Sequence, residues 1–252
     1  MKVQLLSDLH LEFFRDQGTE FIKSLDPSGV DVLILAGDIS VGGRIRSALR
    51  QFCEKYPRVI YVSGNHEYYR CSPEEVAEYI EEAKAASPNL HVLDSSMVEI
   101  GGVRFAGATL WFRDDPMNFT YQNMLNDFHM IEDFVPWVYD ENRKAEAFLG
   151  DVLSALEGPP DVVVTHHLPS NECVTPQYQG SPLNRFFVAP VADITPVDLL
   201  PRYWFFGHTH DPNSFTREGC RFQCNPMGYP HEPKRGFQKK LVFEIQPRSA
   251  LP

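Results

Sequence analysis

Histidines, aspartates and one asparagine gather in short segments that each follow a run of apolar residues. Six of the nine histidines of this 252-residue sequence stand in such segments: His10, His66, His166, His167, His208 and His210. The same segments supply Asp8, Asp38 and Asn65. Imidazole nitrogens combined with carboxylate and amide oxygens suit divalent ions such as Mn²⁺, Fe²⁺, Zn²⁺ or Mg²⁺. The residue types therefore point to metal chemistry.

The segments differ in how specific they are when each is taken alone. In GHTH at 207–210, two imidazoles stand on alternate residues, which face the same side of an extended chain. Asp8 and His10 share that spacing, but a surface aspartate and histidine would occur about as often. Taken alone, Asp38 fits an aspartate that caps the following helix better than it fits a ligand. The prediction rests on all the segments together.

Together, the five segments offer more ligands than one ion needs. They also include GNHE at 64–67, where a glycine suits a tight turn that presents its neighbours, and the histidine pair at 166–167. Two ions roughly 3.5–4 Å apart that share a bridging carboxylate would use such a set. The sequence thus predicts a dinuclear site.

The apolar runs before these segments are predicted to be buried β-strands, because they are short and rich in β-branched or aromatic residues. Functional groups of open α/β sheets gather in the loops beyond the carboxyl ends of the strands. The fold could therefore bring all five segments to one edge. Strands are predicted at 3–6, 32–36, 59–62, 103–109, 161–165, 203–206 and 241–245.

Helical patterns separate the predicted strands. The segment SPEE at 72–75 is typical of a helix start, with proline in the first turn and a capping-box glutamate. An apolar stripe predicts a helix over 145–156, which a Gly-Pro pair ends, and a weaker pattern predicts one over 44–56. Strands that alternate with helices predict an α/β sheet sandwich.

Composition limits the classes of function. The formal net charge of −11 argues against a large nucleic-acid footprint, because phosphate backbones demand a basic surface. It leaves room for a small phosphorylated substrate, since bound cations would reverse the charge locally. No segment approaches the ~20 consecutive apolar residues of a membrane span, and residues 1–6 are too short for a signal peptide. Five irregularly placed cysteines indicate free thiols, so a cytoplasmic location is expected.

In their order, the segments SDLH, GDI, GNHE, THH and GHTH resemble the motifs of the calcineurin-like metallophosphoesterase superfamily. The match spans residues 8–210, and NPMGYPHEP at 225–233 is similar to a small bacterial or phage-type branch. The resemblance implies a four-layer fold in which two mixed β-sheets pack as a sandwich flanked by helices. The chain is expected to form a single domain over 1–252, with an aromatic-rich insertion at 112–140 that folds over one face.

The resemblance also implies a role for each ligand. One metal would be held by Asp8, His10, Asp38 and His210. The other would be held by Asp38, Asn65, His166 and His208. Asp38 would then bridge the two ions, which are expected to be Mn²⁺, with Fe, Zn or Mg as alternatives.

His66 matches the family histidine that contacts the substrate phosphate and protonates the leaving group. Glu67 stands where the family often has an aspartate that orients this histidine, and a longer carboxylate could still do so, which leaves the orienting residue open. His167 has no ligand role in the pattern. Six more residues border the expected cleft and are interpreted first as surface or packing residues: Tyr121, Asn123, Asp127, His129, Tyr229 and His231.

The predicted activity is hydrolysis of phosphomonoesters or phosphodiesters by in-line attack of a hydroxide that bridges two metals. The expected partner is a small phosphorylated substrate or a phosphoprotein, with long nucleic acid disfavoured and no membrane. Two alternatives stay open: a metal-dependent hydrolase of amides, and an idle scaffold of the same fold that binds a partner protein. The sequence does not specify the substrate, the native metal pair, the oligomeric state or the role of 112–140.

Overall fold

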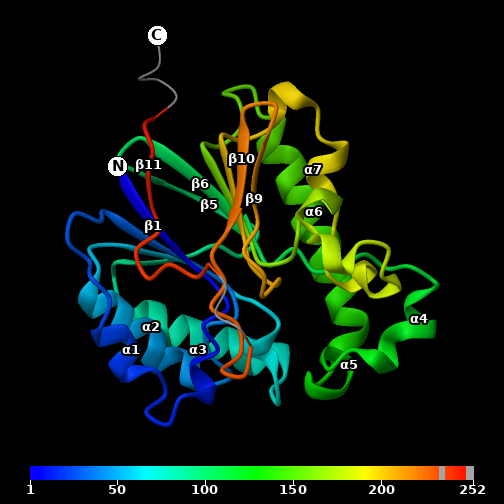
Figure 1. The fold of residues 1–252 in the computed structure, drawn as a ribbon, viewed down its shortest axis with the longest axis horizontal. Helices are drawn as coiled ribbons and strands as arrows, with labels where there is room; N and C mark the ends of the chain where they lie inside the picture. Colours follow the sequence, from blue (N-terminus) through cyan, green and yellow to red (C-terminus); the bar gives the residue numbers. More distant parts are fainter. Residues whose placement is uncertain (233–235, 248–252) are drawn as a thin grey trace.

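The computed structural model describes residues 1–232 and 236–247, so that Pro233, the last residue of the NPMGYPHEP segment, lies outside the described residues. Two β-sheets pack face to face, and helices cover their outer faces (Figure 1). The predicted fold class, a sandwich of two mixed sheets flanked by helices, is confirmed.

The first sheet has the order β11-β1-β2-β3-β4, from β11 (Val242–Glu244), β1 (Lys2–Leu6), β2 (Val32–Ala36), β3 (Val59–Val62) and β4 (Leu90–Val92). β1 to β4 run parallel, and β11 pairs antiparallel with β1. Parallel neighbours need crossover connections. Here the crossovers contain α1 (Thr19–Lys23), α2 (Arg44–Lys55) and α3 (Pro73–Ala86).

The second sheet has the order β5-β6-β7-β8-β10-β9. Its strands are β5 (Ser96–Ile100), β6 (Val103–Ala108), β7 (Val162–Thr165), β8 (Tyr203–Phe206), β9 (Ser214–Arg217) and β10 (Cys220–Cys224). The four inner strands are parallel, whereas β5 and β9 are antiparallel edges. α6 (Phe134–Leu153) and α7 (Val191–Ile194) cover its outer face (Figure 1).

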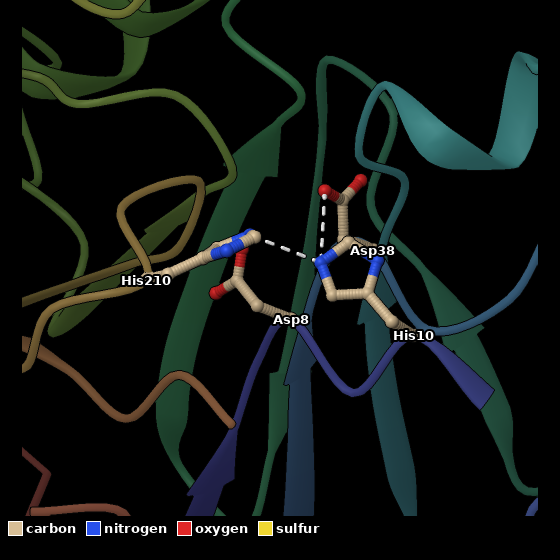
Figure 2. Close-up of side chains that lie close together, drawn as sticks. All are labelled: Asp8, His10, Asp38 and His210. Atoms are coloured by element: carbon tan, nitrogen blue, oxygen red, sulfur yellow. Dashed lines mark hydrogen bonds and ion pairs between the residues drawn. The ribbon is translucent and has the colours of Figure 1, made fainter. Parts of the chain in front are cut away.

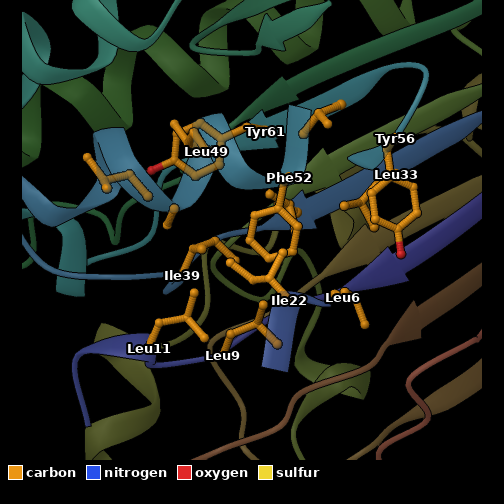
Figure 3. Close-up of a cluster of buried hydrophobic side chains, with 14 of the residues drawn as sticks. Leu6, Leu9, Leu11, Ile22, Leu33, Ile39, Leu49, Phe52, Tyr56 and Tyr61 are labelled. Atoms are coloured by element: carbon orange, nitrogen blue, oxygen red, sulfur yellow. The ribbon is translucent and has the colours of Figure 1, made fainter. Parts of the chain in front are cut away.

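Both faces of the central strands are buried, which explains why their sequences are continuous apolar runs. One apolar cluster fills the space between the two sheets. Another lies between the first sheet and its helices, where Leu6 and Leu33 of the strands face Phe52 of α2 (Figure 3). The capping box that starts α3 is formed by Ser72 and Glu75, as predicted.

The predicted helix over 145–156 has the wrong limits. α6 begins earlier and ends at Leu153, so that Leu156 is exposed instead of lying in the apolar stripe. The hydroxyl of Ser154 donates to the carbonyl of Gly150, a local bond that competes with continuation of the helix.

The stretch 112–140 contains α4 (Asn118–Tyr121), α5 (Asp127–Met130) and the start of α6. Its aromatic residues form a separate apolar cluster with Trp111 and Phe186. The remaining short helices are 3₁₀ turns: η1 (Leu11–Phe13), η2 (His66–Tyr68), η3 (Gln122–Met124), η4 (Asn171–Cys173), η5 (Pro176–Tyr178), η6 (Pro182–Phe186) and η7 (Val197–Leu199). Within the described ranges, no helix is both long and apolar enough to cross a membrane.

Candidate metal centre

The candidate ligands stand in the loops that leave β1, β2, β3, β7 and β8 at their carboxyl ends. Four of them have left-handed backbone conformations, with φ of 51° for Asp8, 46° for His10, 55° for Asp38 and 65° for His208. Asp and His are among the non-glycine residues that tolerate this region best. Left-handed residues of this kind cluster at functional sites. Here each one turns the chain sharply where a strand ends.

Glycines in three of the motifs allow these loops to approach one another closely. A Cβ atom on Gly64 would lie 2.2 Å from Asp38 Oδ1, and one on Gly37 would lie 2.2 Å from His166 Nδ1. A Cβ on Gly207 would lie 2.5 Å from the carbonyl oxygen of Ala36. The motif glycines therefore provide the space that the ligands occupy.

The first ligand group consists of Asp8, His10, Asp38 and His210, whose ligand atoms lie within 4.8 Å of one another (Figure 2). His10 Nε2 lies 3.0 Å from His210 Nε2 and 3.8 Å from Asp38 Oδ2. These nitrogen and oxygen atoms converge on a common point from β1, β2 and β8.

The second ligand group consists of Asp38, His166 and His208, also with ligand atoms within 4.8 Å of one another. His166 Nε2 lies 3.4 Å from Asp38 Oδ1 and 3.1 Å from Asn65 Oδ1, so that the asparagine oxygen joins this group. Asp38 belongs to both groups, and its two carboxylate oxygens face different histidines. This is the arrangement that a bridging carboxylate requires.

Buried polar atoms without a partner test whether the residues fit metal ions. Asp8 Oδ2 and His208 Nε2 are buried and have no hydrogen-bond partner among the described residues. An unpaired buried polar atom is costly, and nearly all such atoms in proteins are satisfied. A cation at each group would satisfy both atoms, so the residues fit a pair of divalent metals.

The electrostatics of the groups point the same way. Burial and the neighbouring Asp38 raise the pKa of Asp8 well above its usual value, and burial raises the pKa of Asp38 to about 6. Burial lowers the pKa of His10 to about 3 and that of His166 to about 4. Neutral imidazole is the form that binds metals, and cations would relieve the repulsion between the two carboxylates.

The far side of most of these ligands is held by another group. His166 Nδ1 lies 3.0 Å from the carbonyl oxygen of Ala36, and His210 Nδ1 lies 2.7 Å from Glu232 Oε2. The amide of Asn65 donates to Asp127 Oδ1 over 2.8 Å, which turns the Asn65 oxygen toward His166. Such partners fix ring and amide orientation and raise metal affinity.

His66 lies beside the ligand groups, between Glu12 and Tyr229. Its Nδ1 lies 3.1 Å from Glu12 Oε1, its Nε2 lies 2.8 Å from the Tyr229 hydroxyl, and its ring stacks on Tyr69. Although burial alone lowers it, the pKa of His66 is raised to about 9 by the carboxylates of Asp38 and Glu12.

Glu67, which could have oriented His66, has another role. Its carboxylate accepts hydrogen bonds from the backbone N–H groups of Asp38, Ile39 and Gly64 at 2.8–3.1 Å. It thereby ties the GDI loop to the GNHE loop. In the described part of the chain, the carboxylate that hydrogen-bonds the His66 ring is Glu12.

The other histidines lie outside the ligand groups. His167 is buried, with Nδ1 3.2 Å from the carbonyl oxygen of Thr109, and packs between Trp111 and His208. Its Nε2 is also buried without a hydrogen-bond partner among the described residues, but His167 belongs to neither ligand group. Of the six cleft-bordering residues, Asp127 and Tyr229 line the cavity described next, whereas Tyr121, Asn123, His129 and His231 do not.

A cavity of about 340 Å³ adjoins the ligand groups and His66. Its outer walls come from two segments, 124–127 and 168–187. The walls combine apolar side chains with amides and hydroxyls: Leu125, Asn126, Leu168, Val174, Thr175, Tyr178, Ser181, Leu183, Asn184 and Phe187. A cavity whose wall is mainly apolar and carries a few polar groups at fixed positions is typical of a binding site for a small ligand.

Glu12, Asp127 and Glu232 are contacts of the site to which the sequence assigns no role. Glu12 follows His10 by two residues, a spacing that could have suggested it. Glu232 lies in the NPMGYPHEP segment and Asp127 among the residues expected to border the cleft, but no spacing along the chain indicates their contacts with His210 and Asn65.

Comparisons with known proteins concern the family and the fold of the chain. The model of the calcineurin-like phosphoesterase family matches residues 1–212. An uncharacterized protein of Acanthamoeba polyphaga mimivirus is 26% identical and is aligned over 96% of each chain. Among solved structures, the phosphopantetheinyl hydrolase of Mycobacterium tuberculosis superposes with a TM-score of 0.75 at 18% identity, covering 100% of this chain and 98% of its own. A putative 5′-nucleotidase of Staphylococcus aureus gives a TM-score of 0.52 at 14% identity, covering 89% of this chain and 48% of its own. At these identities the two structures show a shared fold.

Proposed function

Since this chain belongs to the calcineurin-like phosphoesterase family, we propose that it hydrolyses phosphomonoesters or phosphodiesters at a pair of divalent metal ions. The observation that carries the proposal is the position of Asp38, whose two oxygens face two separate groups of ligands. A single metal would leave one of these groups without a cation.

The residues that would hold the pair divide into two sets. The first set is Asp8, His10, Asp38 and His210. The second set is Asp38, Asn65, His166 and His208. When bound, two such cations supply Lewis acidity toward a phosphoryl oxygen and lower the pKa of water, so that a hydroxide nucleophile exists near neutral pH.

The protein's own residues supply the binding field and the proton. With two dications bound, the net charge of the site would be positive, because only two of its ligands are carboxylates and Asn65 is neutral. A positive site would attract a phosphate although the chain as a whole is acidic. His66 Nε2 faces the Tyr229 hydroxyl at the edge of the cavity, where an ester's leaving oxygen would lie. A proton from this nitrogen would neutralise the departing alkoxide, an effect worth about 10²–10⁴-fold in rate.

Mn²⁺ is the proposed metal, with Fe, Zn or Mg as alternatives. Carboxylate and amide oxygens mixed with imidazoles suit these ions, and availability decides among them more than ligand type.

The cavity supports a small ester rather than a long polymer. The phosphopantetheinyl hydrolase of similar fold acts, by its name, on a phosphopantetheinyl group. The mixed apolar and amide walls beside the site suit an alcohol of that general kind, so a phosphopantetheinyl ester belongs among the first substrates to be tested.

The test is a hydrolysis screen of protein stripped with a chelator and reloaded with each metal. The screen compares monoesters, diesters, nucleotides and a phosphopantetheinyl ester as substrates of the wild type and of the variants Asp38→Asn and His66→Ala. Asp140→Asn is the control, because Asp140 is an exposed carboxylate on α6. We expect metal-dependent turnover that Asp38→Asn abolishes, that His66→Ala lowers by about 10²–10⁴-fold, and that the control retains. Turnover that survives metal removal refutes the proposal. Metal binding without hydrolysis of any ester supports the scaffold alternative instead.

A further inference from the structure

Glu12 lies in η1, two residues after the ligand His10, and its side chain is 8% exposed. One oxygen, Oε1, lies 3.1 Å from His66 Nδ1 and 3.3 Å from His10 Nδ1. The two rings meet edge to face, with centroids 4.4 Å apart. A single carboxylate therefore touches both a ligand of the first group and the proposed proton donor.

We propose that Glu12 is the positioning residue of His66. An ionised carboxylate only accepts hydrogen bonds, so Nδ1 of His66 carries a hydrogen and donates it to Glu12. Nε2 is then the nitrogen directed at Tyr229 and the cavity. Glu67 does not take this role, because its carboxylate accepts from three backbone N–H groups and, among the described residues, the carboxylate at the His66 ring is that of Glu12.

The same contact aligns His10. With its Nδ1 directed at Glu12, the Nε2 atom of His10 faces His210 and Asp38 in the first ligand group. Glu12 thus fixes the orientation of the His10 ring and of the His66 ring relative to each other. A carboxylate in this position fixes the ring's orientation and tautomer without itself receiving a proton.

The step that Glu12 assists rests on the proposed phosphoesterase activity. As the P–O bond to the leaving group breaks, its electron pair stays on the leaving oxygen. That oxygen takes the proton from His66 Nε2, which leaves a neutral imidazole that still donates from Nδ1 to Glu12. The nucleophilic water supplies the new P–O bond, and one of its protons restores the His66 imidazolium.

The kinetic test uses esters that differ only in the leaving group. A 4-nitrophenolate departs without a proton, whereas an alkoxide needs one, so loss of a proton donor affects the alkyl ester selectively. We expect Glu12→Ala to lower kcat for the alkyl ester by about 10–100-fold, which is a part of the roughly 10²–10⁴-fold that general acid catalysis contributes, with KM little changed. With the metal held at a saturating concentration, so that the contact of Glu12 with His10 does not limit metal binding, the 4-nitrophenyl ester should change by a few-fold at most. Glu12→Gln, which keeps an acceptor oxygen, should lie between wild type and Glu12→Ala.

Two comparisons separate positioning from a merely structural effect. The double variant Glu12→Ala/His66→Ala should be no slower on the alkyl ester than His66→Ala alone, because residues that act as a unit are not additive. Glu20→Gln, an exposed glutamate on α1, is the matched control and should behave as wild type. Equal losses on both esters, or additive losses in the double variant, overturn the proposal.

A measurement on metal-free protein tests the hydrogen bond between Glu12 and His66 without an activity assay. In protein labelled with ¹⁵N-histidine, the His66 Nδ1–H should give a protected signal in wild type that Glu12→Ala removes. An unchanged His66 signal overturns the proposal. If wild type hydrolyses no ester with any metal, the proposed function fails, whereas this signal still tests whether Glu12 positions His66.

Discussion

Asp127 provides the sharpest test of how the segment 112–140 contributes to the metal centre. It is buried, it lies in α5, and its Oδ1 accepts both the Asn65 amide over 2.8 Å and the Tyr69 hydroxyl over 2.7 Å. Asp127→Ala removes this acceptor. The Tyr69 hydroxyl can turn to water in the cavity, because Tyr69 is only half-buried. The buried Asn65 amide loses its 2.8 Å hydrogen bond and keeps only the longer one, of 3.3 Å, to the Tyr69 hydroxyl.

The expected magnitude follows from the loss of the hydrogen bond between the Asn65 amide and the Asp127 carboxylate. A hydrogen bond to a charged group contributes about 1.5–3 kcal/mol. Asn65 can also rotate its oxygen away from His166, which weakens the second ligand group. Removal of a group that orients a ligand typically lowers metal affinity by about 10–100-fold. We expect a loss of this size for one of the two Mn²⁺ ions.

Asp127→Asn is the matched control. Because both donors use the same oxygen of Asp127, an asparagine can keep that oxygen in place and put its amide where the other oxygen stands. Mn²⁺ titration by calorimetry and thermal unfolding should therefore show a loss in Asp127→Ala and near wild-type behaviour in Asp127→Asn. Wild-type Mn²⁺ affinity in Asp127→Ala would refute the proposal that Asp127 orients Asn65.

Two further predictions concern the loops and the helices. Gly64→Ala places a methyl group 2.2 Å from Asp38 Oδ1. It should therefore lower the free energy of unfolding, measured by thermal unfolding, by about 1–3 kcal/mol and weaken Mn²⁺ binding. Gly150 lies on α6 with open space around it, so Gly150→Ala should raise the free energy of unfolding by about 0.5–1 kcal/mol. Unchanged Mn²⁺ binding in Gly64→Ala would contradict the role given to this glycine. Ser72→Ala removes the capping box of α3 and should cost about 1 kcal/mol of stability, with unchanged Mn²⁺ binding measured by titration.

The strands that carry the ligands could be predicted because their physical signal is strong. β2 and β3 are buried on both faces, so their sequences are unbroken apolar runs. Parallel pairing then brings their carboxyl ends together, which is why the candidate ligands converge as expected from their positions after strands.

The edge strands β4, β5 and β9 could not be predicted in the same way, whereas the edge strand β11 matches the prediction at 241–245. β5 and β9 alternate exposed and half-buried residues, and β4 has only three residues. Such strands carry little apolar signal, and their pairing partners decide their structure. Leu156 does not continue the apolar stripe, because α6 ends at Leu153, where the hydroxyl of Ser154 donates to the carbonyl of Gly150.

The contacts behind the ligands also escaped prediction. The amide of Asn65 meets Asp127, which lies 62 residues further along the chain, and His66 meets Tyr229 across 163 residues. Contacts of this kind depend on how loops pack, and periodicity within one segment does not record them. The motifs therefore indicate the ligands, whereas the residues that orient them become visible only in three dimensions.

The number of metal ions per chain tests the central claim most directly. A crystal of the Mn²⁺-loaded protein, measured at the manganese absorption edge, should show two anomalous peaks, one at each ligand group, with Asp38 in contact with both. A single peak, or peaks away from Asp38, would contradict the proposal of a metal pair bridged by this aspartate.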